Sequence, residues 1–166
     1  MNRKPLILTL IVVLMGLSLA AFIWLPGWAA VTAAEPSPRT GHTLTPLGDY
    51  VYLFGGWVET TALAAAANAP RAPLGIPAND LSRFDGDEKQ WRLLQCENPP
   101  AARFLHSAAV SGGWLWVFFG VDASYNLLDD IWSYNPGTNT WTQQPSTGDV
   151  PLPRAMAAAA SLDGYR

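Results

Sequence analysis

The feature that most constrains the fold of this 166-residue chain is an internal repeat. Two stretches share the order Arg-x-x-His, an aromatic-rich apolar run, Gly, Asp, a second apolar run and Trp, and a Pro-rich return then leads to the Arg of the next copy. The recurring positions are Arg39, Arg103 and Arg154; His42 and His106; Gly55, Gly56 and Gly120; Asp80 and Asp130; and Trp91 and Trp141. A unit of this length buries its apolar face only by stacking on neighbouring copies.

The copies set the boundaries along the chain. Repeat one covers 38–102, repeat two covers 103–153, and a third copy occupies 154–166. Repeat one is longer because of residues 57–78, an Ala- and Pro-rich stretch that breaks both strand and helix patterns. We interpret 57–78 as a loop insertion in which 62–69 forms one or two helical turns, since insertions project from one face of a repeat array.

Each complete copy has the pattern of four short strands. Aromatic and β-branched residues, which favour strands, fill four runs per copy, and clusters of Gly, Asp, Asn and Pro separate the runs. The predicted strands are 43–45, 50–54, 81–84 and 91–94 in repeat one, and 107–110, 114–119, 130–134 and 141–144 in repeat two. The third copy supplies one strand, 157–162, and a turn at 163–164.

Together these positions resemble a kelch repeat, which has a period of about 50 residues. The resemblance implies an all-β fold, a partial kelch-type β-propeller of about 2.5 four-stranded blades over 35–166. Closed propellers have about 4–8 blades, so we expect a fragment of a longer propeller, or a short chain that closes with blades from other chains. One position departs from the pattern, because Gly55-Gly56 corresponds to Gly120-Val121. A Val with a positive φ would be strained there, so we expect a remodelled turn.

An apolar segment precedes the repeats. Residues 6–25 carry no charge, and Arg3 and Lys4 come before them. This pattern is typical of a secretory signal, and the run is also long enough to span a bilayer, which takes about 20 residues. We therefore expect 1–34 to form one hydrophobic helix, either a cleaved signal peptide or a transmembrane signal anchor. Both alternatives place 35–166 outside the cytoplasm, secreted or membrane-anchored.

Composition and motifs exclude several function classes. Ten Lys and Arg against thirteen Asp and Glu give a net charge of −3, which argues against nucleic-acid binding. The single cysteine, Cys96, excludes an internal disulfide and leaves open a packed thiol or one that pairs with another chain. The sequence contains no phosphate-binding loop, nucleophile elbow or His-Glu-x-x-His motif. We expect no cofactor and no metal, and we favour binding over catalysis.

Each recurring polar or aromatic residue has both a functional and a structural interpretation. The arginines fit an anion site or repeat arginines that bind carbonyls, and the histidines fit metal ligands or packing. The tryptophans fit sugar stacking or blade packing. The aspartates, with Asp122 and Asp129 near the second of them, fit a Ca²⁺ site or turn acceptors. Recurrence at equivalent places favours structure, so we assign all twelve recurring positions to the repeat scaffold.

The expected function is a binding module for protein or glycan partners. Binding residues gather on loops above rigid scaffolds, so the insertion is the candidate contact surface. Its candidate contact residues are Trp57, Leu63, Arg71, Leu74 and Ile76. The resemblance also implies alternatives: a carbohydrate-active kelch-propeller enzyme, similar to sialic-acid mutarotases or, less favoured, to copper sugar oxidases, which need two His and a Cys-linked Tyr. A structural envelope assembly protein is a third alternative.

Overall fold

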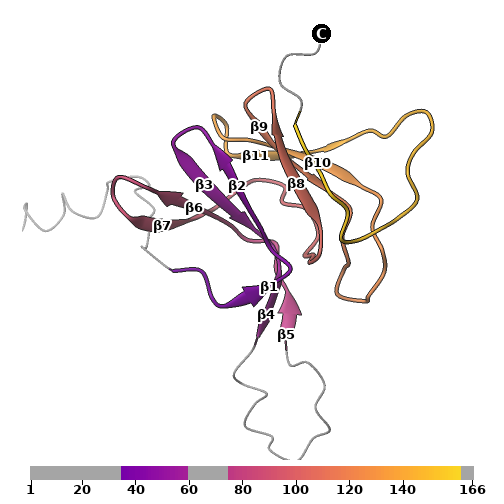
Figure 1. Cartoon of the computed structure of the whole chain (residues 1–166), viewed down its shortest axis with the longest axis horizontal. Coiled ribbons are helices and arrows are strands. Elements are labelled where there is room, and N and C mark those ends of the chain that lie inside the picture. The colour runs from indigo at the N-terminus through magenta and orange to yellow at the C-terminus, as the bar shows by residue number, and fades with distance from the viewer. Residues whose placement is uncertain (1–34, 60–74, 162–166) are drawn as a thin grey trace, which may run out of the picture. The chain divides into compact units, whose positions relative to one another are not determined.

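Two four-stranded antiparallel sheets, one from each complete repeat, form most of the computed structural model, which describes residues 35–59 and 75–161 (Figure 1). All of these residues belong to one unit, Thr32–Arg166. Blade one contains β2 (Thr43–Leu47), β3 (Tyr50–Phe54), β6 (Leu81–Asp85) and β7 (Gln90–Leu94), in that order across the sheet. Blade two contains β8 (Ser107–Ser111), β9 (Trp114–Phe118), β10 (Ile131–Asn135) and β11 (Thr140–Gln144). The eight strands predicted for the two complete repeats are all present, with ends that differ by at most two residues.

Short polar turns join neighbouring strands within each blade. Gly48 and Gly112 have positive φ angles of 61° in the β2–β3 and β8–β9 hairpins, a conformation that glycine adopts without strain. The second hairpin of each blade begins with a side-chain turn: Asp85 Oδ1 accepts from the Asp87 N–H at 3.0 Å, and Asn135 Oδ1 accepts from the Gly137 N–H at 2.9 Å. Such local acceptors favour turns over continued strand.

The core lies where the two blades face each other. Tyr52 and Phe54 are alternate residues of β3, so their side chains share one face of blade one. Phe54 packs on Trp141 with ring centroids 4.8 Å apart, and Tyr52 packs on Tyr134 at 5.9 Å. All four residues are buried. Neither sheet could bury these rings alone, so the second copy supplies the apolar surface that the first one needs.

The insertion contains strands that the loop interpretation did not predict. β4 (Trp57–Glu59) pairs antiparallel with both β1 (Arg39–Thr40) and β5 (Gly75–Pro77), which gives a small sheet in the order β1-β4-β5. The expected loop over 57–78 is therefore wrong at both of its ends. Pairing satisfies main-chain groups that a simple loop would leave to water. The expected helical turns at 62–69, and the contact residues Leu63, Arg71 and Leu74, lie outside the described residues.

The third copy does not form the strand expected at 157–162, since its described part, up to 161, has no strand. A strand needs a neighbour to pair with. In the two complete copies that neighbour is the next strand along the chain, and its counterpart would lie beyond 161. The start of the copy still follows the repeat. The Met156 N–H donates to the Leu105 carbonyl at 2.9 Å, as the Leu105 N–H donates to Gly41 at 2.8 Å.

The turn after the second strand is conserved between the blades rather than remodelled. Positive φ angles occur at Gly55 (60°) and Gly56 (100°) in blade one, and at Phe119 (61°) and Gly120 (107°) in blade two. Gly120 is thus the counterpart of Gly56, whereas Val121 has no positive φ and forms a β-bridge with Phe104. The expected strain at Val121 is wrong, and Phe119 is the residue held in the conformation that favours glycine.

Gly120→Ala tests this turn. A Cβ at Gly120 would lie 2.9 Å from the His106 Cβ and 3.0 Å from the Phe104 carbonyl oxygen, at a φ that L residues rarely adopt. We expect the unfolding free energy to fall by about 2–4 kcal/mol. The matched control is Gly112→Ala, because Gly112 also has a positive φ but faces open space, and it should cost only about 1–2 kcal/mol. Equal losses for the two variants in urea melts would contradict the close packing at Gly120.

The expected N-terminal helix at 1–34, with its apolar run 6–25, lies outside the described residues. Within 35–59 and 75–161 no helix is long and apolar enough to cross a membrane.

Candidate functional site

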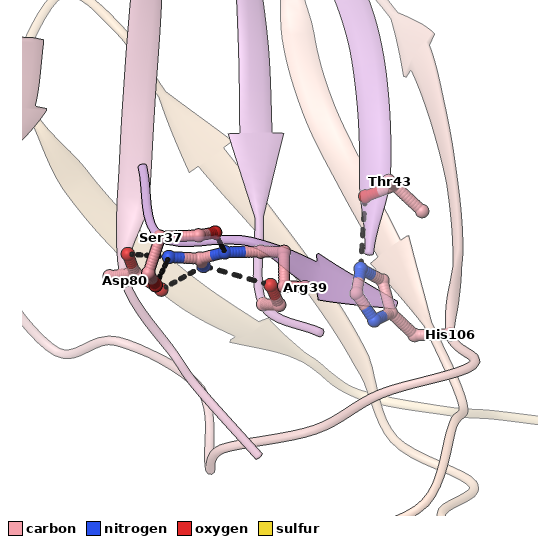
Figure 2. A network of polar contacts seen from close by, with 6 residues as sticks. Ser37, Arg39, Thr43, Asp80 and His106 are labelled. Carbon is pink, nitrogen blue, oxygen red and sulfur yellow. Dashed lines mark hydrogen bonds and ion pairs between the residues drawn. The ribbon is translucent and has the colours of Figure 1, made fainter. Parts of the chain in front are cut away.

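An Arg–Asp pair, with a buried arginine and a partly exposed aspartate, joins the start of each repeat to the beginning of the third strand of the same blade. In blade one, Arg39 Nη1 and Nη2 donate to the two Asp80 carboxylate oxygens at 2.6 and 3.0 Å (Figure 2). In blade two, Arg103 donates in the same way to Asp130 at 2.6 and 2.7 Å. Arg39 Nη1 also donates to the Gly55 carbonyl at 3.0 Å, and Arg103 Nη1 donates to the Phe119 carbonyl at 2.9 Å. The arrangement fixes the turn after the second strand.

The Asp130 carboxylate is held ionised by its partners. Burial raises the pKa of Asp130, but hydrogen bonds from Arg103 and from the Trp132 indole outweigh burial, so the pKa lies below its usual value. Asp122 faces its own loop, where the Ser124 and Asn126 N–H groups donate to it at 2.8 and 2.9 Å. Among the described residues, no three His, Cys, Asp or Glu side chains gather closely enough to hold a metal ion.

His106 connects the two blades. Its Nε2 is 2.9 Å from the Thr43 hydroxyl of β2 (Figure 2), and its ring lies edge-on to Phe54 with centroids 5.3 Å apart. Burial, together with electrostatic interactions with nearby Arg103 and His42, lowers the pKa of His106 from 6.5 to about 3. The imidazole is therefore neutral at physiological pH.

The two recurring tryptophans pack on an aromatic residue of the strand beside them. Trp91 lies 5.1 Å from Phe84, and Trp141 lies 5.2 Å from Tyr134. Trp141 is buried because blade one covers its other side, whereas Trp91 is half-buried. Both rings lie beside the hairpin between the third and fourth strands, at the end of each blade opposite the connections that follow β3 and β9.

Cys96 lies in the return segment between the blades. Its thiol is half-buried, 3.3 Å from the Asn139 Oδ1, and burial raises its pKa to about 11. The sulfur is therefore a neutral thiol at pH 7, and a neutral thiol is a poor nucleophile.

Both blades present their variable connections at one end, which we call the loop end. In blade one the register pairs Thr43 with Phe54 and Phe54 with Leu81, so the start of β2, the end of β3 and the start of β6 coincide. Blade two has the same arrangement for β8, β9 and β10. The loop end consists of 39–42, 55–59, 75–80, 103–106 and 119–130. The β2–β3 and β8–β9 hairpins lie at the opposite end (Figure 1).

An aromatic pocket of about 300 Å³ opens at the loop end, between segments of the two repeats. Its lining residues are Thr40, Gly41, Trp57, Phe104, Leu105 and Tyr125. The Trp57 ring contacts Phe104 with centroids 5.1 Å apart and Tyr125 at 6.0 Å, and the Phe104 and Tyr125 rings are 6.3 Å apart. Tyr125 is 62% exposed. We call these three residues the aromatic triad.

Gly75 allows Trp57 to lie over the small sheet. A Cβ on Gly75 would stand 2.1 Å from the Trp57 Nε1, so only a residue without a side chain fits beneath the indole. The pocket therefore depends on the pairing of β4 with β5. Because Trp57 comes from the insertion and Phe104 from the start of repeat two, the site exists only when two consecutive repeats are stacked.

Sequence reasoning found one member of this pocket and missed the rest. Trp57 was predicted as a contact residue, and Ile76, also predicted, is 59% exposed on β5. Phe104 and Leu105 were missed although they fill the two variable positions of the Arg-x-x-His motif, where repeat one has Thr40 and Gly41. Two apolar residues at variable positions next to long connections are a signal that could have identified the site.

Comparison with known proteins assigns the chain to a family. The KLHDC2/KLHL20/DRC7 Kelch-repeats domain matches residues 14–165. The chain belongs to the kelch-repeat family. The expected resemblance is confirmed, and the two described sheets are kelch blades.

The relatives are larger proteins. The flagellar outer arm dynein alpha chain of Chlamydomonas reinhardtii is 35% identical over 125 residues, which are 75% of this chain and 3% of that protein. Kelch domain-containing protein 3 of Rattus norvegicus is 32% identical over 133 residues, 76% of this chain and 33% of its own length. Dynein regulatory complex subunit 7 of C. reinhardtii is 32% identical over 130 residues, covering 76% and 10% respectively. The chain thus spans a third or less of each.

Proposed function

We propose that this kelch-repeat module binds a protein partner through its loop end. The aromatic triad carries the proposal. Tyr and Trp are enriched at protein interfaces, and here they surround a pocket whose lining is mostly apolar. The loops that hold them rest on two rigid sheets, so the pocket is formed before a partner arrives.

The kelch relatives support a role within protein assemblies. One is named as a dynein alpha chain and another as a subunit of a dynein regulatory complex. Both names describe a component of a larger protein assembly. We propose the same kind of role, a module that holds one protein against another, for this chain.

Site-specific photocrosslinking tests the proposal. Benzoylphenylalanine placed at Tyr125 or at Ile76, both exposed at the loop end, should crosslink the partner in the source cells. The matched control position is Trp114, which is 37% exposed where β9 begins, at the opposite end of blade two. Crosslinks from Trp114 alone, or from none of the three positions, would contradict binding at the loop end.

We further propose that additional kelch blades stack on blade two. Arg154 follows the repeat, because its Nε donates to the Leu152 carbonyl at 2.9 Å as the Arg103 Nε donates to Ala101 at 3.1 Å. Within the described residues, however, the Arg154 guanidinium has no carboxylate partner. Leu152 and Met156 beside it are 77% and 78% exposed. A following blade would supply an Asp and cover these residues.

We propose that the module lies outside the cytoplasm and that residues 6–25 place it there, as part of a signal peptide or a membrane anchor. The uncharged run behind Arg3 and Lys4 supports it. The family match starts at residue 14 and so includes part of this run, and Trp28 stands eleven residues before Arg39, much as Trp91 stands twelve before Arg103. Intact mass and fractionation of the native protein decide whether this segment is a signal peptide, a membrane anchor or part of the repeat domain. A cytoplasmic protein that retains residues 1–34 would overturn the proposed location.

A further inference from the structure

We propose that the pocket of the aromatic triad takes a proline-bearing, uncharged, extended segment of the partner protein. This inference rests on the proposed protein-binding function and names the chemistry of the segment that enters the site. It follows from the hydrogen-bonding groups, the charge and the size of the pocket, taken in turn.

The floor of the pocket has few hydrogen-bond acceptors to offer. The Gly41 carbonyl accepts from the Leu105 N–H at 2.8 Å, the Leu105 carbonyl from Met156 at 2.9 Å, and the Phe104 carbonyl from Val121 at 2.9 Å. An ordinary peptide buried on this floor would bring N–H groups that lack partners, and each such group carries a desolvation penalty. A proline has no N–H, so it avoids that penalty.

The rim supplies hydroxyl groups that suit the carbonyls of such a segment. Tyr125 and Thr40 line the pocket, both residues are exposed, and neither hydroxyl makes a hydrogen bond with another described residue. A polyproline-type helix forms no internal hydrogen bonds, so its carbonyls remain free to accept. Aromatic-lined grooves bind such helices with little loss of conformational entropy, because the helix is already formed.

The charge of the lining residues and the size of the pocket restrict the chemistry of the occupant further. None of the six lining residues carries a charge at neutral pH, so a charged side chain would lose its hydration without gaining a partner. A pocket of about 300 Å³ is at the small end of the range for ligand sites, about 300–1,000 Å³, which suits one or two side chains. An oligosaccharide fits less well, because the Gly41, Phe104 and Leu105 carbonyls already accept hydrogen bonds. Among the lining residues, mainly the Tyr125 and Thr40 hydroxyls remain to accept from its many hydroxyl donors.

Peptide selection tests the inference on the whole 166-residue chain. Random 12-residue peptides displayed on phage are selected against the protein, with the Tyr125→Ala variant as counter-selection. We expect the enriched peptides to contain neighbouring prolines and few charged residues. A synthetic copy of an enriched peptide should bind Tyr125→Ala at least tenfold more weakly, and replacement of its prolines by alanine should cause a similar loss.

Two further variants keep the test independent of folding. Tyr125→Phe and Thr40→Val remove one exposed hydroxyl each, and we expect each to weaken the peptide about threefold or more. Trp114→Ala, at the opposite end of blade two, should leave binding unchanged. Matching urea melts confirm that each variant is folded.

The outcomes separate this inference from the proposed function. Failure to select any peptide, selected peptides without proline, or equal binding to the Tyr125→Ala variant would overturn the inference. Binding of an oligosaccharide panel that depends on Tyr125 would overturn it in favour of a glycan. If photocrosslinks at Tyr125 and Ile76 still capture a partner in those cases, the protein-binding function stands and only the chemistry of the segment is wrong.

Discussion

Arg103→Ala should lower the free energy of unfolding by about 3–5 kcal/mol, the cost of breaking a buried ion pair by removal of one partner. The Arg103 side chain is fully buried and that of Asp130 is 19% exposed. The substitution leaves the Asp130 carboxylate without its main partner and also leaves the Phe119 carbonyl without its Arg103 donor. Urea denaturation of the 166-residue chain at pH 7 measures the loss.

Two comparisons make this result specific. Arg103→Lys should recover only part of the stability, because an ammonium cannot donate two parallel hydrogen bonds from a planar fork. Arg154→Ala should cost less than about 1 kcal/mol, because Arg154 is exposed and has no carboxylate partner among the described residues. If Arg103→Ala cost no more than Arg154→Ala, the ion pair would not hold the blade together.

Below pH 6.5, the stability of the folded chain should fall by up to about 1.4 kcal/mol per pH unit because of His106 alone. Its pKa is about 3 in the folded protein and 6.5 when unperturbed. Between those values the unfolded chain binds a proton that the folded chain does not, so unfolding becomes more favourable as the pH decreases. The effect is absent above pH 6.5 and increases until the pH reaches about 3.

Urea melts from pH 4.5 to 7.5 measure this dependence. The window stays above 3.8, the ordinary pKa of Asp130. Its pKa is lower in the folded protein, so a loss of the same sign from Asp130 develops only as the pH falls through that value. His106→Gln removes the titrating group, and a Gln amide still offers Thr43 a polar partner. This variant should show a flatter pH profile, whatever its stability at pH 7.5. An unchanged profile would show that His106 does not titrate as a buried imidazole.

The strands and their order could be predicted from the sequence because local features specify them. Alternating aromatic residues such as Tyr52 and Phe54 define a strand face, and Asp85 and Asn135 provide acceptors for the turns. Because the repeat occurs twice, these strand and turn patterns appear in both copies. The third copy shows the limit of this reasoning. The repeat predicts a strand at 157–161, but this Ala-rich run has little strand propensity of its own, and a strand also needs a partner.

The candidate site could be predicted only in part. Trp57 was found because the insertion stands out as an interruption of the repeat. Phe104 and Tyr125 belong to a different copy, and no local pattern indicates that their rings lie 5.1 and 6.0 Å from the Trp57 ring. The pairing of β4 with β5 was missed for a similar reason, since three-residue strands carry too few side chains to show a period.

The sequence by itself determined the kelch family, the two blades and the residues that recur in each, because these depend on period, propensity and turn chemistry. Only the tertiary structure decided which residues of different copies meet. Stacking of the blades buries His106 against Thr43 and lowers its pKa, and it brings Trp57 of the insertion to Phe104 and Tyr125 of the next repeat. Such contacts depend on distances across the stack, which no local stretch of sequence specifies.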